Sequence, residues 1–278
     1  MYNLPKVCIQ GLGFVGAAMA TAVATACGSN GKPVYQVVGV DLDTPVGRHR
    51  VESIRSGKFP FATSDTFLQE SLSRAIDRGN LTTTTDESTY DSADVVVIDV
   101  ALDISFRGKE PDLDMETLER AIRKVARRIP ENSLILVETT VPPGTCETLL
   151  VPILKEELQQ RGLSPEGVNL AHSYERVMPG SAYLDSIVRF WRVYAGATSK
   201  AADACEVFLS SFIDIDEFPL TRLSSMTASE TAKVLENTYR ATNIAFIDEW
   251  TKYAEAVNID LYEVIDAIRV RPTHSNIR

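Results

Sequence analysis

The amino-acid sequence predicts an α/β fold in which a doubly wound parallel sheet is followed by one long helix. Short apolar runs alternate with longer segments of helical periodicity through most of the chain, which is the pattern of successive strand–helix units. The runs at 94–102 and 133–140 are continuous, as expected for strands that are covered on both faces. Residues 227–257 contain no glycine or proline and predict the long helix.

The individual elements are expected in a regular order along the chain. A glycine-rich turn at 11–16 separates the first strand from a helix of small residues, and Gly79 marks the end of a later helix. The predicted strands are 6–10, 35–41, 94–102, 133–140, 168–174 and 190–197, and the predicted helices are 14–26, 48–57, 66–79, 114–130, 145–162, 227–257 and 261–270.

The alternation of strand and helix patterns stops near residue 222, which predicts that the chain has two parts. Residues 1–222 are expected to form one α/β domain, and residues 223–278 a helical segment too small to be a complete domain. Apolar residues occur on most faces of the helix at 227–257. We therefore expect this helix to be covered by other elements or by a second subunit.

The composition excludes several classes of protein. The 278 residues include 38 acidic and 28 basic side chains, a formal charge of −10, so the basic surface needed for nucleic acid or an anionic membrane is not expected. No secretory signal and no apolar run of the ~18 residues needed to span a membrane is visible. The four cysteines and three histidines are scattered, which predicts reduced thiols in the cytoplasm and no metal site.

The sequence GLGFVG at 11–16 has the GxGxxG pattern between a predicted strand and a predicted helix. Its first glycine permits a tight turn, its second lets the backbone approach a pyrophosphate, and its third allows close helix packing. Asp41 ends the next strand, where it can accept a hydrogen bond from a ribose 2′-hydroxyl, which favours NAD over NADP. A loop insertion at 27–36 explains the long interval to Asp41. The expected cofactor contacts are Gly11, Gly13, Phe14, Val15, Gly16 and Asp41.

Three further segments could carry chemistry. Residues 138–145 follow a buried strand at its carboxyl end, where open α/β sheets bind ligands, although the segment is also compatible with a proline-rich turn. Glu175 beside Arg176 follows the next strand and could be a base or a surface ion pair. Lys233 and Asn237 share one face of the long helix and could stabilise an oxyanion, although such pairs usually lie on a solvated surface.

The order and spacing of five segments give the chain a family resemblance over essentially its whole length. It resembles the amino-terminal part of the UDP-glucose/GDP-mannose dehydrogenase family, the NAD-dependent nucleotide-sugar 6-dehydrogenases. The segments are GLGFVG, VVGVDLD, ETTVPPGT, YERVMPG and AKVLENTYRATNIAFIDEW.

The resemblance implies a fold and a reaction. The fold comprises an NAD-binding Rossmann domain, a central helix that forms a homodimer and a second domain for the nucleotide sugar. The reaction oxidises the sugar C6 alcohol to a carboxylate with two NAD molecules, through a thioester on a cysteine.

The resemblance also implies roles for individual residues. Thr140 matches a threonine that helps to hold the catalytic water and is expected to contact the cofactor as well. Glu175 matches the general base. Lys233 and Asn237 match the pair that stabilises the oxyanion and fixes the substrate.

The chain departs from the family pattern in two places. Pro179 stands where members that act on UDP-glucose have a second glutamate, which favours a UDP-N-acetylhexosamine over UDP-glucose or GDP-mannose as substrate. Residues 100–103 replace a VPTP-like segment.

The nucleophilic cysteine of the family is expected in a glycine-rich stretch that this chain does not reach. None of the four cysteines present matches that nucleophile, so we expect the chain to be inactive by itself. Cys146 is the only one near the expected crevice and is kept as a minor candidate for the nucleophile. Two alternatives remain open at this point: a relative of the β-hydroxyacid dehydrogenases, and a non-catalytic NAD-binding, dimerising fragment.

Overall fold

The computed structural model describes residues 4–102, 104–178 and 180–274. These residues belong to two compact units, Met1–Glu230 and Thr231–Arg278. The predicted boundary between residues 1–222 and 223–278 stays a prediction.

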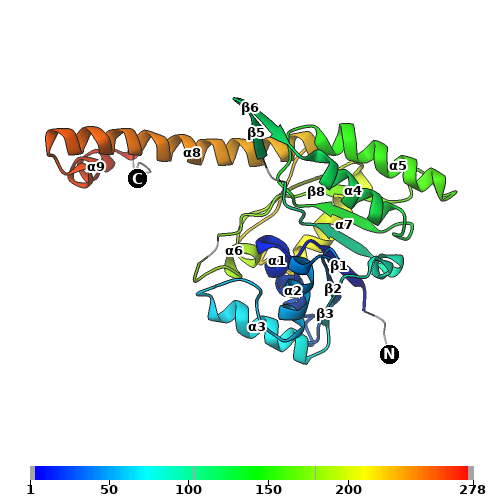
Figure 1. Ribbon diagram of the computed structural model, residues 1–278. Helices are drawn as coiled ribbons and strands as arrows, with labels where there is room; N and C mark the ends of the chain where they lie inside the picture. The colour runs from blue at the N-terminus through cyan, green and yellow to red at the C-terminus, as the bar shows by residue number, and fades with distance from the viewer. Residues whose placement is uncertain (1–3, 103, 179, 275–278) are drawn as a thin grey trace. The chain divides into compact units, whose positions relative to one another are not determined.

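The first unit is built on a sheet of eight strands in the order β10-β9-β8-β7-β4-β1-β2-β3 (Figure 1). Every neighbouring pair is parallel except β8 and β9. The chain order reverses between β1 and β4, which is the topological switch point where open α/β sheets bind ligands. The strands are β1 Lys6–Gln10, β2 Gln36–Val40, β3 Leu81–Thr84, β4 Val95–Ile98, β7 Leu134–Val137, β8 Asn169–His172, β9 Val193–Gly196 and β10 Thr221–Arg222.

Helices cover both faces of this sheet, because alternate residues of its central strands point to opposite sides. Val7 and Ile9 of β1 pack into one apolar cluster, and Cys8 between them packs into the other. The first cluster includes α1 Phe14–Thr25, α2 Pro45–Arg55, α3 Thr66–Asp77, α6 Asp185–Val188 and α7 Ser199–Ser210. The second includes the 3₁₀ helix η1 Glu87–Ser92, α4 Met115–Ala126, the π-helical turn η2 Cys146–Leu150 and α5 Val151–Gln160.

The long helix α8, Met226–Val257, begins within the first unit. Glu230 in its first turns is buried, and its carboxylate accepts hydrogen bonds from the backbone amides of Gly144 at 2.5 Å and Cys146 at 2.7 Å. Ser229 Oγ lies 2.9 Å from His172 Nδ1 at the end of β8. The start of α8 is therefore fixed to the turn that follows β7 and to the neighbouring strand.

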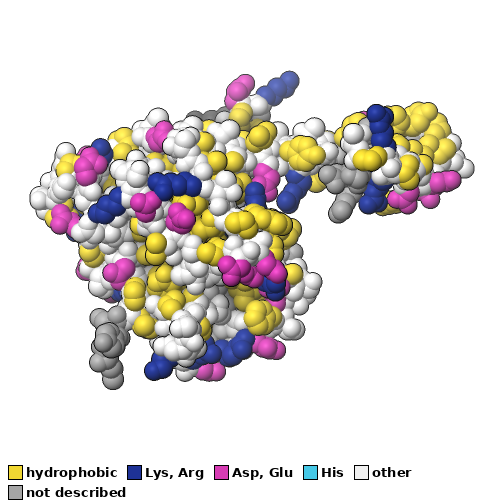
Figure 2. Space-filling model, turned by 180° about the vertical axis from the view of Figure 1, so that it is seen from behind, with side chains coloured by type: hydrophobic (Ala, Val, Ile, Leu, Met, Phe, Trp, Pro, Cys, Tyr) yellow, Lys and Arg dark blue, Asp and Glu magenta, His cyan; other side chains and the backbone are white. Residues whose placement is uncertain are grey.

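The second unit contains the remainder of α8, the helix α9 Leu261–Arg269 and the 3₁₀ turn η3 Pro272–His274. Asn258 adopts a left-handed φ of 55°, which ends α8, and Asp260 caps α9 by accepting a hydrogen bond from the Tyr262 amide. Large apolar side chains gather on the surface of this unit (Figure 2). The exposed residues of α8 include Leu235, Tyr239, Ile244, Phe246, Trp250 and Tyr253.

The predicted fold class is confirmed, with one local departure. The predicted strands and helices are all present, but β9 runs antiparallel to β8, with Ala171 opposite Gly196. Among the described residues between these two strands the only helix is α6, which is too short to serve as the crossover that a parallel pair requires.

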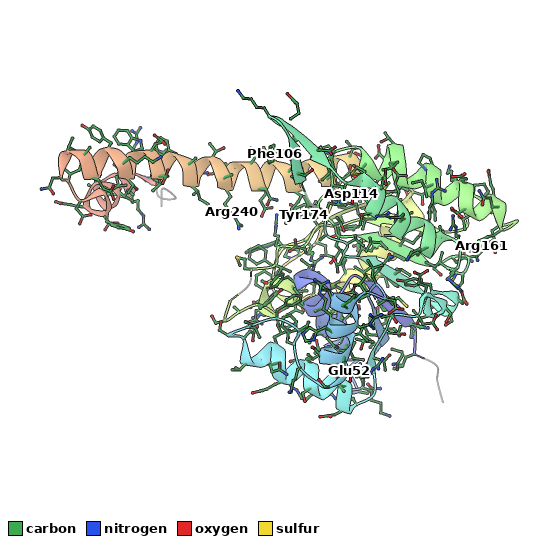
Figure 3. The ribbon with its side chains drawn as sticks, in the orientation of Figure 1. Glu52, Phe106, Asp114, Arg161, Tyr174 and Arg240 are labelled. Carbon is green, nitrogen blue, oxygen red and sulfur yellow. The ribbon has the colours of Figure 1, made fainter. Side chains whose placement is uncertain are left out.

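The elements that were not predicted are the short segments η1, α6, β10 and η3, and two further features. The strand predicted at 94–102 ends at Ile98, and a separate antiparallel hairpin follows, formed by β5 Ile104–Arg107 and β6 Glu110–Leu113. Gly108 has a left-handed φ of 69° at its turn, and Phe106 on β5 is exposed (Figure 3). The second is β3, whose sequence LTTT is too polar to have been recognised as a strand.

Candidate cofactor and catalytic site

The three glycines of the GxGxxG turn have three different environments. Gly11 adopts a left-handed φ of 95°, and a Cβ atom there would lie 2.5 Å from the carbonyl oxygen of Asp99. A Cβ atom on Gly16 would lie 1.8 Å from the carbonyl oxygen of Gly11. A Cβ atom on Gly13 would have no neighbour within 4 Å. Packing therefore requires glycine at positions 11 and 16, whereas the space in front of Gly13 is open.

The helix that follows this turn begins without a side-chain cap. Gly13 is the N-cap of α1, and no acidic residue lies in the first turn. Four other helices of the unit, by contrast, begin with a threonine or aspartate side chain that accepts a backbone hydrogen bond; these residues are Thr44, Asp65, Asp114 and Thr198. An uncapped helix start presents backbone amides and the positive end of the helix dipole, which suits the pyrophosphate of a dinucleotide.

Asp41 follows β2 and is joined to the glycine turn. Its Oδ2 accepts a hydrogen bond from the Leu12 amide at 3.2 Å, and its Oδ1 accepts one from the Leu42 amide at 2.7 Å. Residues 26–35 form the loop between α1 and β2, where the insertion was predicted. The fold therefore brings Asp41 beside the glycine turn despite their separation in sequence.

Two aromatic rings and an arginine border the same site. Phe14, the first residue of α1, stacks on Phe61 with the ring centroids 4.0 Å apart. The Arg50 guanidinium lies 5.6 Å from the centre of the Phe61 ring, and its Nη1 is 3.4 Å from Asp41 Oδ2. Sequence reasoning predicted Phe14 but missed Phe61 and Arg50, which belong to no motif.

The candidate catalytic residues of the first unit lie at the carboxyl ends of neighbouring strands. Thr140 follows β7 and is exposed, whereas the adjacent Thr139 is buried and donates a hydrogen bond to the Val100 carbonyl at 2.9 Å. Glu175 follows β8, is half-buried and accepts a hydrogen bond from the Val177 amide. The Arg176 guanidinium donates to the Trp191 carbonyl at 2.7 Å. The roles assigned to Thr140 and Glu175 stay predictions.

The other two candidates lie in the second unit. Lys233 and Asn237 are separated by about one turn of α8; Lys233 is half-buried and Asn237 is exposed. Their roles also stay predictions. Pro179 and Asp103, where the chain departs from the family pattern, lie outside the described residues.

A buried group of charges, which sequence reasoning missed, lies at the ends of β4 and β7. Glu138 and Arg192 are both buried and form an ion pair with Oε1 and Nη1 2.5 Å apart. Asp99 follows β4, and its Oδ2 is shielded from solvent without a hydrogen-bond partner among the described residues. Burial raises the pKa of Asp99 well above its ordinary value, and the carboxylates of Glu138 and Glu175 raise it further.

Replacing Asp99 by asparagine is expected to stabilise the protein increasingly as the pH rises. Because the pKa of Asp99 is higher in the folded state, the folded protein holds a proton that the unfolded chain loses above the ordinary pKa of 3.8. The stability contributed by Asp99 is therefore greatest below that value and falls as the pH rises toward the folded-state pKa, by at most about 1.4 kcal/mol per pH unit. Asparagine has no such dependence.

Urea unfolding at pH 5 and pH 7 measures this difference. Asp216→Asn serves as the control because Asp216 is an exposed aspartate. If the stability difference between Asp99→Asn and the unmodified protein is the same at both pH values, the raised pKa of Asp99 in the folded state is contradicted.

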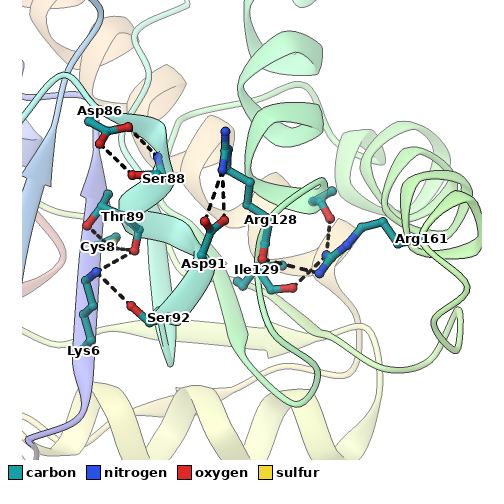
Figure 4. Close-up of polar contacts among 11 residues, drawn as sticks. Lys6, Cys8, Asp86, Ser88, Thr89, Asp91, Ser92, Arg128, Ile129 and Arg161 are labelled. Atoms are coloured by element: carbon teal, nitrogen blue, oxygen red, sulfur yellow. Dashed lines mark hydrogen bonds and ion pairs between the residues drawn. The ribbon is translucent and has the colours of Figure 1, made fainter.

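The cysteine side chains are poorly suited to nucleophilic catalysis. Cys8, Cys146 and Cys205 are buried, and burial raises the pKa of each thiol, that of Cys8 to about 11. Cys8 Sγ lies 3.8 Å from the Thr89 carbonyl oxygen, within the contacts that attach η1 to β1 (Figure 4). Cys27 is exposed in the loop between α1 and β2. Cys146 is therefore not supported as a nucleophile, because its thiolate is disfavoured and its side chain is inaccessible.

The described residues contain neither a metal-binding cluster nor a membrane-spanning helix. Within residues 4–102, 104–178 and 180–274, no group of three or more His, Cys, Asp or Glu side chains is arranged to hold a metal ion. No helix in this part of the chain is long and apolar enough to cross a membrane.

Residues 5–210 match the NAD binding domain of the UDP-glucose/GDP-mannose dehydrogenase family, and residues 227–277 match its central domain. The UDP-N-acetyl-D-mannosamine dehydrogenase of Pyrococcus horikoshii is 33% identical over 269 residues, which cover 96% of this chain and 58% of that protein. The NDP-N-acetyl-D-galactosaminuronic acid dehydrogenase of Ralstonia nicotianae is 27% identical over 271 residues, covering 96% and 58%. The chain thus spans somewhat more than half the length of these relatives.

Solved structures have the same fold. The UDP-D-ManNAc dehydrogenase from Pyrococcus horikoshii superposes with a TM-score of 0.80 at 29% identity, covering 96% of this chain and 58% of that one. A ternary complex of GDP-mannose dehydrogenase from Pseudomonas aeruginosa gives 0.79 at 25% identity, covering 95% and 56%. The predicted cofactor, NAD, is confirmed by the match of the first unit to an NAD binding domain. The chain belongs to the UDP-glucose/GDP-mannose dehydrogenase family.

Proposed function

We propose that this chain is the cofactor-binding part of an NAD-dependent dehydrogenase that oxidises the C6 alcohol of a nucleotide sugar to a carboxylate. The observation that carries the proposal is the site formed by the glycine turn, with open space before Gly13, an uncapped α1 and Asp41 beside the turn. The amides of the first turn of α1 would hold the pyrophosphate, and Asp41 would face the adenosine ribose. When bound, NAD supplies the acceptor for a hydride from the sugar carbon.

The chain's own residues then have distinct tasks in the proposed reaction. Glu175 removes a proton from water, which Thr140 helps to orient at the neighbouring strand end. Lys233 supplies a positive charge and Asn237 an amide donor for the oxygen that becomes negative. Membership of the family excludes the β-hydroxyacid dehydrogenase alternative, and the non-catalytic fragment remains the alternative for experiment.

The proposed substrate is a UDP-N-acetylhexosamine. Relatives from Pyrococcus horikoshii and Methanocaldococcus jannaschii are both named UDP-N-acetyl-D-mannosamine dehydrogenases, and each matches 96% of this chain. The sequence ERxxPG at 175–180 supports the same class over UDP-glucose and GDP-mannose.

The proposed assembly is a cytoplasmic homodimer formed through α8. The apolar side chains of α8 that the sequence predicted to be covered are exposed within the second unit, among them Tyr239 and Trp250. Exposed apolar surface of this kind is typical of an interaction site. Sedimentation equilibrium should therefore give twice the chain mass of 30.6 kDa, and a single-chain mass at tens of micromolar protein would contradict the dimer.

Titration of the purified chain with NADH tests the cofactor proposal directly. We expect saturable binding, followed by nicotinamide fluorescence, and the absence of binding at millimolar NADH would overturn the proposal. A second assay supplies UDP-N-acetylmannosamine and NAD. Because the three buried thiols are poor nucleophiles, we expect the chain by itself to form no uronate, and uronate formation would contradict that expectation.

A further inference from the structure

Arg50 occupies a position from which it could influence which dinucleotide binds. It lies on α2, and its Nη1 is 3.4 Å from Asp41 Oδ2. Its guanidinium lies over Phe61, whose ring stacks on Phe14 at the start of α1. The arginine is thus held between the aspartate expected at the ribose and an aromatic wall of the cofactor site. No motif in the sequence assigns it a role.

The charges around Asp41 would oppose the attraction of an anion to this arginine in the unmodified protein. The Asp41 side chain is only 8% exposed and accepts from the Leu12 and Leu42 amides as well as from Arg50. Its negative charge compensates that of Arg50 and would repel a phosphate on the ribose 2′-oxygen. The Arg50 side chain remains 30% exposed, so it is accessible once the carboxylate is removed.

We propose that Arg50 can bind a phosphate on the ribose 2′-oxygen, but that its ion pair with Asp41 prevents this in the unmodified protein. Arg50 is therefore a latent phosphate-binding residue. Replacing Asp41 by a neutral side chain removes both the repulsion and the partner of Arg50. The guanidinium then donates charge-assisted hydrogen bonds to the phosphate oxygens, for which its planar geometry is suited. The chain is accordingly one substitution away from binding NADPH. This inference rests on the cofactor site proposed above.

The nearby Arg48 provides a matched control. It is also on α2, carries the same charge and also pairs with an aspartate, Asp43, at 2.5 Å. Arg48 and Asp43 are 57% and 69% exposed, and their pair is separate from the Asp41 carboxylate. If the gain in NADPH affinity came from the general positive charge of α2, replacing either arginine would reduce it. If it came from a phosphate contact, only replacing Arg50 would reduce it.

The experiment measures NADH and NADPH affinities by fluorescence for the unmodified chain and for Asp41→Ser, alone and combined with Arg50→Ala or Arg48→Ala. Asp41→Ser should raise the affinity for NADPH relative to NADH by roughly tenfold or more. The added Arg50→Ala should abolish most of that gain, and Arg48→Ala should leave it within about threefold. Calorimetry with 2′,5′-ADP and 5′-ADP repeats the comparison without the nicotinamide half.

The outcomes separate this inference from the cofactor proposal. Failure of the unmodified chain to bind NADH would overturn the cofactor site itself. If the unmodified chain binds NADH but Asp41→Ser gains no NADPH affinity, or gains as much without Arg50, the latent phosphate site is wrong. Asp41→Asn is the second variant if serine disturbs the turn, because its single amide oxygen can still accept from one of the two backbone amides, Leu12 or Leu42, that bind Asp41.

Discussion

Replacing Arg192 by methionine is expected to lower the free energy of unfolding by about 3–5 kcal/mol. Arg192 and Glu138 are both buried, so the substitution leaves a carboxylate in a region of low dielectric without the cation that compensates it. Asp99 is held near that carboxylate and adds to the penalty when it is ionised. Urea unfolding at neutral pH measures the loss.

The comparison for this variant is Arg48→Met, which breaks an exposed ion pair. Arg48 and Asp43 are well solvated, and removing such a pair costs about 0–1 kcal/mol. A loss below about 1 kcal/mol for Arg192→Met would show that the buried pair is unimportant for stability.

Replacing Gly16 by alanine is expected to disturb both the fold and cofactor binding. The new methyl group would lie 1.8 Å from the Gly11 carbonyl oxygen, and since both atoms belong to or extend from the backbone, the turn and α1 must move apart. The expected cost is about 3 kcal/mol, at the upper end for overpacking. NADH affinity should fall at least about tenfold, because the displaced turn no longer presents the start of α1.

Gly13→Ala separates the two effects, since its methyl group meets no protein atom within 4 Å. Its stability should change by less than about 1 kcal/mol, while its NADH affinity should also fall, because the methyl group takes space that the cofactor needs. Thermal unfolding and NADH titration of both variants test this contrast. Normal NADH binding by Gly13→Ala would show that the open space before α1 is not the pyrophosphate site.

The cofactor site could be predicted from sequence because its signals are local. Gly11, Gly13 and Gly16 occupy fixed positions between one strand and one helix, and the structure shows a packing requirement for glycine at positions 11 and 16. Asp41 was found because it ends the next strand, whatever the length of the loop between them. The catalytic candidates were found only through resemblance to a family, because a threonine or a glutamate after a strand has no distinctive local pattern.

The features that were missed depend on distant contacts or on weak local signals. Arg192 stands in an apolar run, and nothing near it in sequence indicates that Glu138, which follows a strand much earlier in the chain, is its partner. The antiparallel pairing of β9 follows from a connection that lacks a long helix, which the alternating pattern does not reveal. The hairpin β5–β6 had a signal in Gly108 at its turn, but its exposed and mixed composition obscured the strands.

The hydrogen bonds of Glu230 have a consequence for selectivity between anions. The amides of Gly144 and Cys146 both point at one carboxylate, so the turn after β7 is an anion receptor that the chain itself fills. A ligand tethered in this way acts at a high effective concentration, which a free phosphate would have to exceed in order to displace it. The first unit thus contains one amide receptor with a resident ligand and another, at α1, that no side chain caps. A phosphate-bearing cofactor is therefore expected at the proposed site at α1 and not at the turn after β7.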